Sequence, residues 1–140
     1  PFDIETIKNN IYDVAGVRVI CSFKDDVYKL VEALKQQDDL TIIAEKDYIK
    51  NYKDNGYRSY HLIVKVPIFL SDKVEHVAVE IQFRTIAMDF WASVEHTIRY
   101  KKAIRNAEAV SEEMKYAADM INQLDNRMAQ IRENIDYVAP

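Results

Sequence analysis

The sequence is poor in cysteine, glycine and proline, and it contains no long apolar run. Its single cysteine, Cys21, can form no internal disulfide, which favours a reducing compartment and predicts a cytoplasmic protein. With two glycines and three prolines in 140 residues, the chain is neither collagen-like nor of low complexity. No apolar stretch approaches the about 20 residues that span a bilayer, so we expect no membrane contact. The net charge of −4 argues against broad charge-driven binding to nucleic acid but leaves room for a local basic pocket.

What is present suits one folded domain. Hydrophobic residues make up 49% of the sequence and charged residues 30%. A chain of this length can bury about 70% of the surface that its unfolded form exposes, which is enough for a core. Periodicity predicts strands over residues 17–22, 41–49, 59–67 and 75–84, and helices over 24–37, 85–101 and from 103 onward. We therefore expect a single α/β (α+β) domain, with a sheet and helices over 1–102 and a C-terminal helix over 103–140.

The clearest alternation of apolar and other side chains runs through residues 75–84. One face of this predicted strand carries Val77, Val79, Ile81 and Phe83. The other face carries His76, Ala78, Glu80, Gln82 and Arg84. Because successive side chains of a strand point to opposite faces, one face should pack on the core while the other meets water or does chemistry.

The C-terminal helix has a sustained heptad pattern. From Ala103 onward, apolar residues recur at alternating spacings of four and three. The pattern continues through Ala107, Val110, Met114, Ala117, Ile121, Leu124, Met128, Ile131, Ile135 and Val138. Either this helix packs on its own domain or it also joins subunits, and the two interpretations weigh about equally from sequence alone.

A polar loop between the second and third predicted strands gathers cations and aromatic rings. Asn55 and Gly56 at its centre are a strong turn signal, and a simple hairpin turn would explain them. The surrounding residues are Lys46, Tyr48, Lys53, Tyr57, Arg58, Tyr60 and His61. Since cations bind phosphate and flat rings stack on bases, the loop also suggests a nucleotide site.

Two carboxylates stand out beside the predicted strands. Asp13 precedes the first strand, and Glu80 lies in the middle of the fourth among apolar neighbours, where a carboxylate without a partner would be costly. A structural salt bridge from Glu80 to Arg18 or Arg84 is one explanation. The other is coordination of Mg²⁺, whose preferred ligands are oxygens.

Other familiar catalytic signals are missing from the sequence. The histidines His61, His76 and His96 have no metal-binding spacing, so zinc is not expected. Cys21 in mid-strand is more typical of a buried hydrophobic residue than of a nucleophile. No glycine-rich phosphate loop is present, so side chains on a sheet face would have to hold a nucleotide.

Three segments in sequence order carry a family resemblance. DVAGVRVI (13–20), KDNGYRSYHLIV (53–64) and VEIQFRTIAMDFWASVEHTIRYK (79–101) resemble the motifs of RelA/SpoT-type alarmone synthetase domains, above all the stand-alone small alarmone synthetases. The resemblance covers about residues 4 to 135. It implies a mixed sheet flanked by helices, of nucleotidyltransferase-like synthetase fold. It also implies pyrophosphoryl transfer from ATP to the 3′-hydroxyl of GDP or GTP, which yields ppGpp or pppGpp and AMP in the stringent response.

The resemblance also implies roles for individual residues. Asp13 resembles a ligand of Mg²⁺, and Glu80 resembles the carboxylate that shares the metal and orients the 3′-hydroxyl. Tyr57 resembles the tyrosine that stacks on guanine, and Arg18 an arginine that packs against the adenine of ATP. The other positions that match the guanine nucleotide site are Lys46, Lys53, Asn55, His61, Gln82 and Glu95. Arg84 lies in a matching segment, with no role assigned.

Relatives also carry a basic segment upstream of the first motif that helps to hold ATP. This chain begins twelve residues before Asp13, so we expect weak or absent synthetase activity from it. By resemblance we expect a homo-oligomer, most simply a tetramer, with pppGpp or single-stranded RNA as regulatory ligands. The alternative is a non-catalytic module of the same fold that binds guanine nucleotides or RNA.

Overall fold

The structure is a computed structural model that describes residues 15–99 and 105–135. Its strands are β1 (Ala15–Cys21), β2 (Thr41–Asp47), β3 (Tyr60–Phe69) and β4 (Val74–Thr85). Its helices are α2 (Lys24–Lys35), α3 (Ile86–Arg99) and α4 (Ala107–Glu133). Every predicted strand and helix is present, with bounds that shift by a few residues. The predicted helix start at Ala103 and the candidate metal ligand Asp13 lie outside the described residues.

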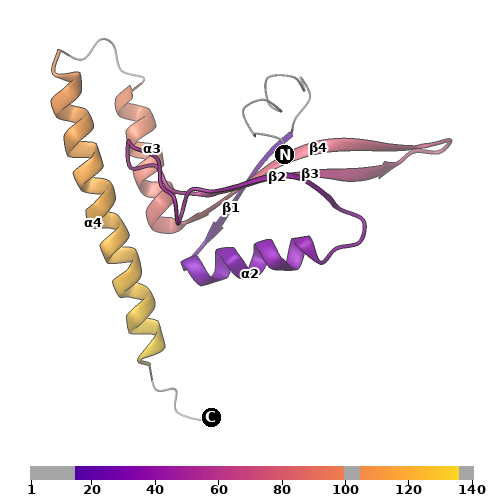
Figure 1. Ribbon diagram of the computed structural model, residues 1–140, viewed down its shortest axis with the longest axis horizontal. Helices are drawn as coiled ribbons and strands as arrows, with labels where there is room; N and C mark the ends of the chain where they lie inside the picture. The colour runs from indigo at the N-terminus through magenta and orange to yellow at the C-terminus, as the bar shows by residue number, and fades with distance from the viewer. Residues whose placement is uncertain (1–14, 100–104, 136–140) are drawn as a thin grey trace.

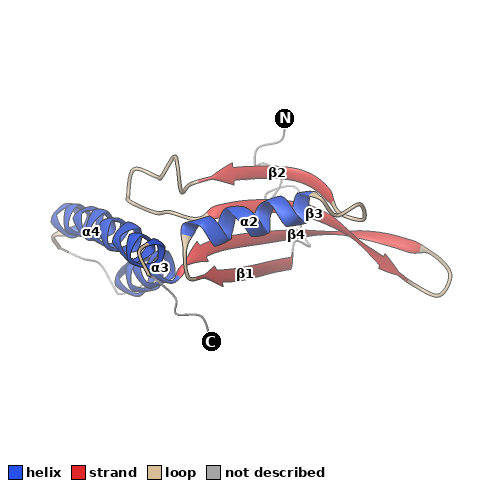
Figure 2. Ribbon diagram, turned by 90° about the horizontal axis from the view of Figure 1, so that it is seen from below, coloured by secondary structure: helices blue, strands red, loops and turns tan. Residues whose placement is uncertain are grey.

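The four strands form one mixed sheet in the order β1-β4-β3-β2. β1 runs parallel to β4, while β3 is antiparallel to both β4 and β2 (Figure 2). The expected mixed sheet is therefore confirmed. β4 is central and long, and its hairpin with β3 extends beyond the other strands (Figure 1).

Helix α2 covers one face of the sheet, and the main core lies between them (Figures 1 and 2). Val27 and Val31 of this helix are fully buried against sheet residues. The buried sheet residues in this cluster are Cys21, Tyr60, Leu62, Val64 and Phe83. Cys21 is 8% exposed, and burial, followed by the charge of Asp26, raises the pKa of its thiol. Cys21 is thus a core residue, as the sequence indicates.

Helices α3 and α4 pack side by side at one end of the sheet (Figure 1). Thr85, the last residue of β4, joins them: its hydroxyl accepts from the backbone N–H of Met88 at 3.2 Å and donates to Asp125 at 2.7 Å. Thr85 therefore caps the start of α3 and anchors the middle of α4. Within the described residues, no helix combines the length and apolar character that a membrane crossing requires.

Only part of the heptad seam in α4 faces α3. Met114, Ala117 and Ile121 pack in a cluster with Trp91 and Ala92 of α3. Farther along, the apolar residues Leu124, Met128 and Ile131 of α4 are exposed, as is Ile135 just beyond its end. Helix α4 has 27 residues and α3 has 14, so the C-terminal part of α4 extends past the start of α3 (Figure 1).

The core position of Leu62 predicts a large loss of stability on truncation. Leu62 is 0% exposed, so Leu62→Ala should lower the free energy of unfolding by about 2–5 kcal/mol. Leu30→Ala is the matched control, because Leu30 on α2 is 42% exposed. Urea unfolding should show a much larger shift in the midpoint for Leu62→Ala; equal shifts would contradict this assignment of the core.

Candidate active site

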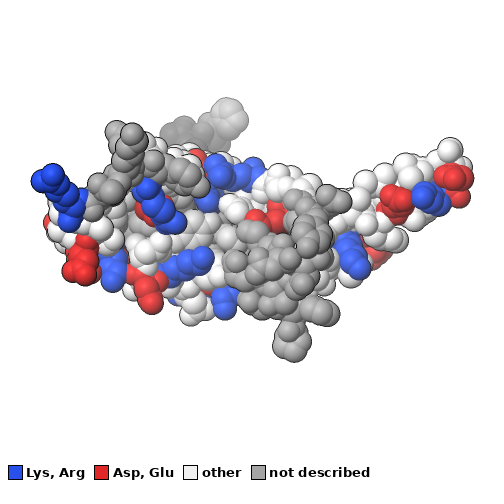
Figure 3. All heavy atoms as spheres, turned by 90° about the horizontal axis from the view of Figure 1, so that it is seen from above, with Lys and Arg blue, Asp and Glu red and all other residues white. Residues whose placement is uncertain are grey.

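The sheet face opposite α2 carries a row of polar side chains. Arg18 of β1 pairs in register with Gln82 of β4, Gln82 with His61 of β3, and His61 with Lys46 of β2. Residues directly opposite on neighbouring strands share a face, so one row across the sheet collects four predicted site residues. Figure 3 views the molecule from this side and shows several lysine and arginine side chains there.

Glu80 lies on the same face, two residues before Gln82, and is 6% exposed. Its Oε1 accepts a hydrogen bond of 2.9 Å from Nε2 of Gln82. The two arginines considered as its salt-bridge partners both pair instead with Asp89 of α3: Arg84 at 3.1 Å and Arg18 at 3.6 Å. Glu80 lines a cavity of about 240 Å³, which we call the glutamate cavity.

The hydroxyl group of Tyr57 is the meeting point of three polar side chains. It accepts from Nη2 of Arg84 at 3.0 Å and from Oγ of Ser59 at 2.9 Å. It also lies 3.0 Å from Nε2 of His61. Either group can donate in this last contact, according to the tautomer of His61. The ring of Tyr57 is thereby fixed at its far end while it remains partly exposed.

Arg84 ties the tyrosine to the carboxylate. Besides the bonds to Tyr57 and Asp89, its Nη2 donates to Oε1 of Gln82 at 3.2 Å. Gln82 in turn donates to Glu80, so a continuous chain of hydrogen bonds links Tyr57 to Glu80. The sequence placed Arg84 on the polar face of its strand but gave no sign that it would connect these two residues.

A second cavity, of about 470 Å³, opens beside Tyr57, and we call it the tyrosine cavity. Its polar lining comprises Arg18, Lys53, Asn55, Tyr57, Arg84, Ser93, Glu95, His96 and Arg99. Glu95 is its carboxylate, and it accepts a hydrogen bond of 2.8 Å from Nε of Arg99. Four lysine and arginine side chains against one carboxylate make a cavity that favours anions. Ser93, His96 and Arg99 were not predicted; the spacing of Glu95 and Arg99, four residues apart on a helix, was the available signal.

The loop residues occupy the rim of the tyrosine cavity. Nζ of Lys53 lies 5.4 Å from the ring centre of Tyr57 and 4.8 Å from that of Tyr48. Oδ1 of Asn55 accepts from the backbone N–H of Tyr57 at 3.0 Å, which closes the turn. Lys46 does not line this cavity; its Nζ lies 5.9 Å from the ring centre of Tyr48. The structure thus gathers Lys53, Asn55 and Tyr57, with Lys46 farther out.

The two cavities adjoin, because Arg18 lines both of them. One offers a flat ring and cations, and the other a buried carboxylate. This arrangement can hold an aromatic, phosphorylated molecule at one side and act on it at the other. These are the features that a nucleotide-binding site requires.

Comparison with known proteins assigns the chain to a family. Residues 3–105 match the family model described as the region found in RelA/SpoT proteins. The GTP pyrophosphokinase YwaC of Bacillus subtilis is 50% identical over 130 residues, which are 93% of this chain and 62% of YwaC. The chain therefore spans somewhat less than two thirds of that relative. It belongs to the RelA/SpoT family.

Solved structures agree with the family assignment. The small alarmone synthetase 2 of Bacillus subtilis superposes with a TM-score of 0.82 at 45% identity, covering 96% of this chain and 78% of that one. The small alarmone synthetase 1 of the same organism, bound to its product pppGpp, also gives a TM-score of 0.82, at 38% identity over 96% of this chain and 69% of that one. The synthetase fold implied by the sequence resemblance is confirmed.

Because cations line the tyrosine cavity, we expect it to bind inorganic pyrophosphate even in the absence of a nucleotide. Lys53→Gln should weaken the affinity for inorganic pyrophosphate by about threefold to tenfold, because it removes one of the cations around the cavity. Lys65→Gln, at an exposed lysine of β3 outside the cavity, is the matched control. Titration calorimetry at two salt concentrations would measure both variants. Equal weakening in the two would show that the anion binds elsewhere.

Proposed function

We propose that this chain is a (p)ppGpp synthetase, which transfers a pyrophosphoryl group from ATP to the 3′-hydroxyl of GDP or GTP and releases AMP. The observation that carries the proposal is the common wall of the two cavities. A guanine nucleotide stacked on Tyr57 would have its ribose directed toward Glu80. The names of the relatives, one of them bound to pppGpp, support the same reaction.

In this reaction the 3′-oxygen of the acceptor forms a bond to the β-phosphorus of ATP. The bond between that phosphorus and the bridging oxygen to the α-phosphate breaks, and AMP leaves with this oxygen. Glu80, oriented by Gln82, accepts the proton of the 3′-hydroxyl. The cations of the tyrosine cavity, Lys53 among them, balance the charge of the acceptor phosphates. Arg18, which is exposed at the junction of the cavities, packs against the adenine of ATP.

Asp13 and Glu80 would hold Mg²⁺ in this proposal. The chemistry of Glu80 fits, since its carboxylate lines a cavity and offers the oxygen ligands that Mg²⁺ prefers. Asp13 lies outside the described residues, and within residues 15–99 and 105–135 no three His, Cys, Asp or Glu side chains come together around a possible metal. Few protein ligands suit Mg²⁺, which retains waters and binds substrate phosphates. When bound, the ion would neutralise charge on the transferred group.

In this proposal, residues 1–102 carry out the reaction, and residues 103–140 form the C-terminal helix of the same domain. It also places the protein in the cytoplasm, where its nucleotide substrates are available.

The charge of Glu80 is the direct test of the proposed reaction. Glu80→Gln keeps the size of the side chain but removes the base, so formation of AMP and of 3′-pyrophosphorylated guanosine nucleotide should fall by about 10²–10⁴-fold. Glu75→Gln, at an exposed glutamate of the same strand, should act like the parent protein. Chromatography of reactions with ATP, GDP and Mg²⁺ would measure both products. Equal yields from Glu80→Gln and the parent would refute the role of Glu80, and binding of GDP without turnover by the parent would favour the non-catalytic module.

We also propose that the chain forms homo-oligomers through an exposed apolar face of α3 and α4. Ile86 and Phe90 are 61% and 60% exposed, and Leu124 and Met128 are 57% and 51% exposed. These four side chains line one cavity of about 420 Å³. An exposed apolar patch of this kind is typical of a protein interface. In the same proposal, pppGpp or single-stranded RNA regulates the assembled form.

A charge placed on this apolar face should disrupt assembly. Leu124→Asp should reduce the mass measured by light scattering at a fixed concentration, because a buried unpaired carboxylate opposes association. Leu70→Asp, at an exposed leucine of the β3–β4 hairpin, is the control. A mass unchanged by Leu124→Asp, or reduced equally by both changes, would contradict the assignment of the interface.

A further inference from the structure

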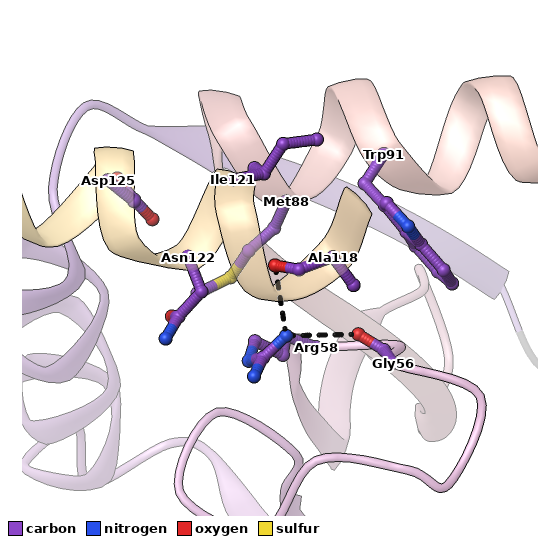
Figure 4. Close-up of a pocket in the computed structure, with 8 residues that line it drawn as sticks. All are labelled: Gly56, Arg58, Met88, Trp91, Ala118, Ile121, Asn122 and Asp125. Atoms are coloured by element: carbon purple, nitrogen blue, oxygen red, sulfur yellow. Dashed lines mark hydrogen bonds between the residues drawn. The ribbon is translucent and has the colours of Figure 1, made fainter. Parts of the chain in front are cut away.

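Arg58, the residue after Tyr57, is a buried cation that points away from both cavities toward α4. It is 7% exposed. Its Nη1 donates to the backbone carbonyls of Gly56 at 3.4 Å and of Ala118 at 3.3 Å, and Figure 4 shows the guanidinium between these two oxygens. Its Nη2 lies 3.4 Å from Oδ1 of Asp119. One side chain therefore ties the loop to the backbone and a side chain of α4.

The backbone of the loop also rests directly on the helices. Gly56 has a φ of +98°, which side-chain-bearing residues rarely adopt. A Cβ atom at this position would lie 2.6 Å from Cβ of Ala118 and 3.5 Å from the ring of Trp91. Trp91 is itself fixed, since its Nε1 donates to the carbonyl of Met114 at 2.8 Å. Only glycine in the loop, facing a small residue on α4, allows this approach.

The loop is closed within itself, so it is expected to move as a unit. The N–H of Lys53 donates to the carbonyl of Tyr57 at 3.1 Å, and the N–H of Gly56 donates to the carbonyl of Lys53 at 2.8 Å. The ring of Tyr52 lies 4.1 Å from the guanidinium carbon of Arg58. A shift of the loop on α4 would therefore carry Lys53 and Tyr57 with it.

We propose that Arg58 is a positioning residue for the acceptor nucleotide, and that α4 acts through Arg58 and through the contact of Gly56 with Ala118. The inference rests on the proposed function, in which Tyr57 stacks on the guanine of GDP or GTP. A loop held in place before binding loses less conformational freedom when the nucleotide arrives, so its affinity is higher. Neither Arg58 nor Ala118 lines the glutamate or the tyrosine cavity, so neither contacts the acceptor in these cavities.

The test compares variants at the contact with a matched control on the same helix. Ala118→Leu adds bulk where α4 meets Gly56, and Asp119→Ala removes the exposed partner of Arg58. Ala109→Leu makes the first substitution at an exposed position of α4. For Ala118→Leu and Asp119→Ala we expect the KM for GDP to rise about fivefold to tenfold. The KM for ATP and the kcat at saturating GDP should stay within about twofold of the parent, as should all constants of Ala109→Leu.

Two measurements without turnover separate positioning from unfolding. Amide hydrogen exchange of residues 52–58 should quicken in Ala118→Leu and Asp119→Ala, while β3 and β4 stay protected. Titration calorimetry should show the same loss of GDP affinity. If Ala118→Leu does not fold, judged by the fluorescence of Trp91, the only tryptophan, then Asp119→Ala and Arg58→Lys carry the test.

Tyr57→Ala distinguishes failure of this inference from failure of the proposed function. If Tyr57→Ala binds GDP as tightly as the parent, the stacking role and with it the proposed function are wrong. If Tyr57→Ala binds weakly while the contact variants bind GDP like the parent, the positioning role alone is wrong. Unchanged exchange of residues 52–58 in the contact variants would overturn it as well.

Discussion

The two-residue period of β4 is the constraint on which the rest of the structure depends. It directs Val79, Ile81 and Phe83 into the core beneath α2, and it directs Glu80, Gln82 and Arg84 to the opposite face. β4 also lies between β1 and β3, so its polar face is where side chains from all four strands can meet. A slip of one residue in register would bury the charges and expose the core.

Burial of charge then dictates how the polar face is arranged. Arg84 and Glu80 are each 6% exposed, so each needs hydrogen-bonding partners that compensate for lost water. Gln82 serves both residues, and the hydroxyl of Tyr57 serves Arg84. The bonds to Oε1 of Glu80 and to Nη2 of Arg84 also hold the ring of Tyr57 and the carboxylate in a fixed relation. One network therefore both compensates buried charge and positions these side chains.

The strand alternation was enough to predict which residues share the polar face, and the Asn55–Gly56 turn predicted the loop. Other features had no signal in the sequence. Asp89 pairs with Arg18 and Arg84 because the first turn of α3 lies at the end of the sheet where β1 and β4 run side by side, a placement that the strand and helix periods do not specify. The seat of the loop on α4 uses a backbone carbonyl and a small side chain, sixty residues from Arg58. A backbone carbonyl is present at every residue, and a close approach between glycine and alanine has no periodic spacing, so the sequence pattern could not reveal this contact.

The contact between Arg58 and Ala118 joins the loop at residues 52–58 to α4, sixty residues later in the sequence. During synthesis the sheet strands and α2 leave the ribosome first, and they can pair before α4 exists. The turn that bears Tyr57 lacks its contacts with α4 until the residues near Ala118 have emerged. The hydrophobic core can therefore form before the loop that bears Tyr57 reaches its final position, and completion of that loop waits for translation of α4.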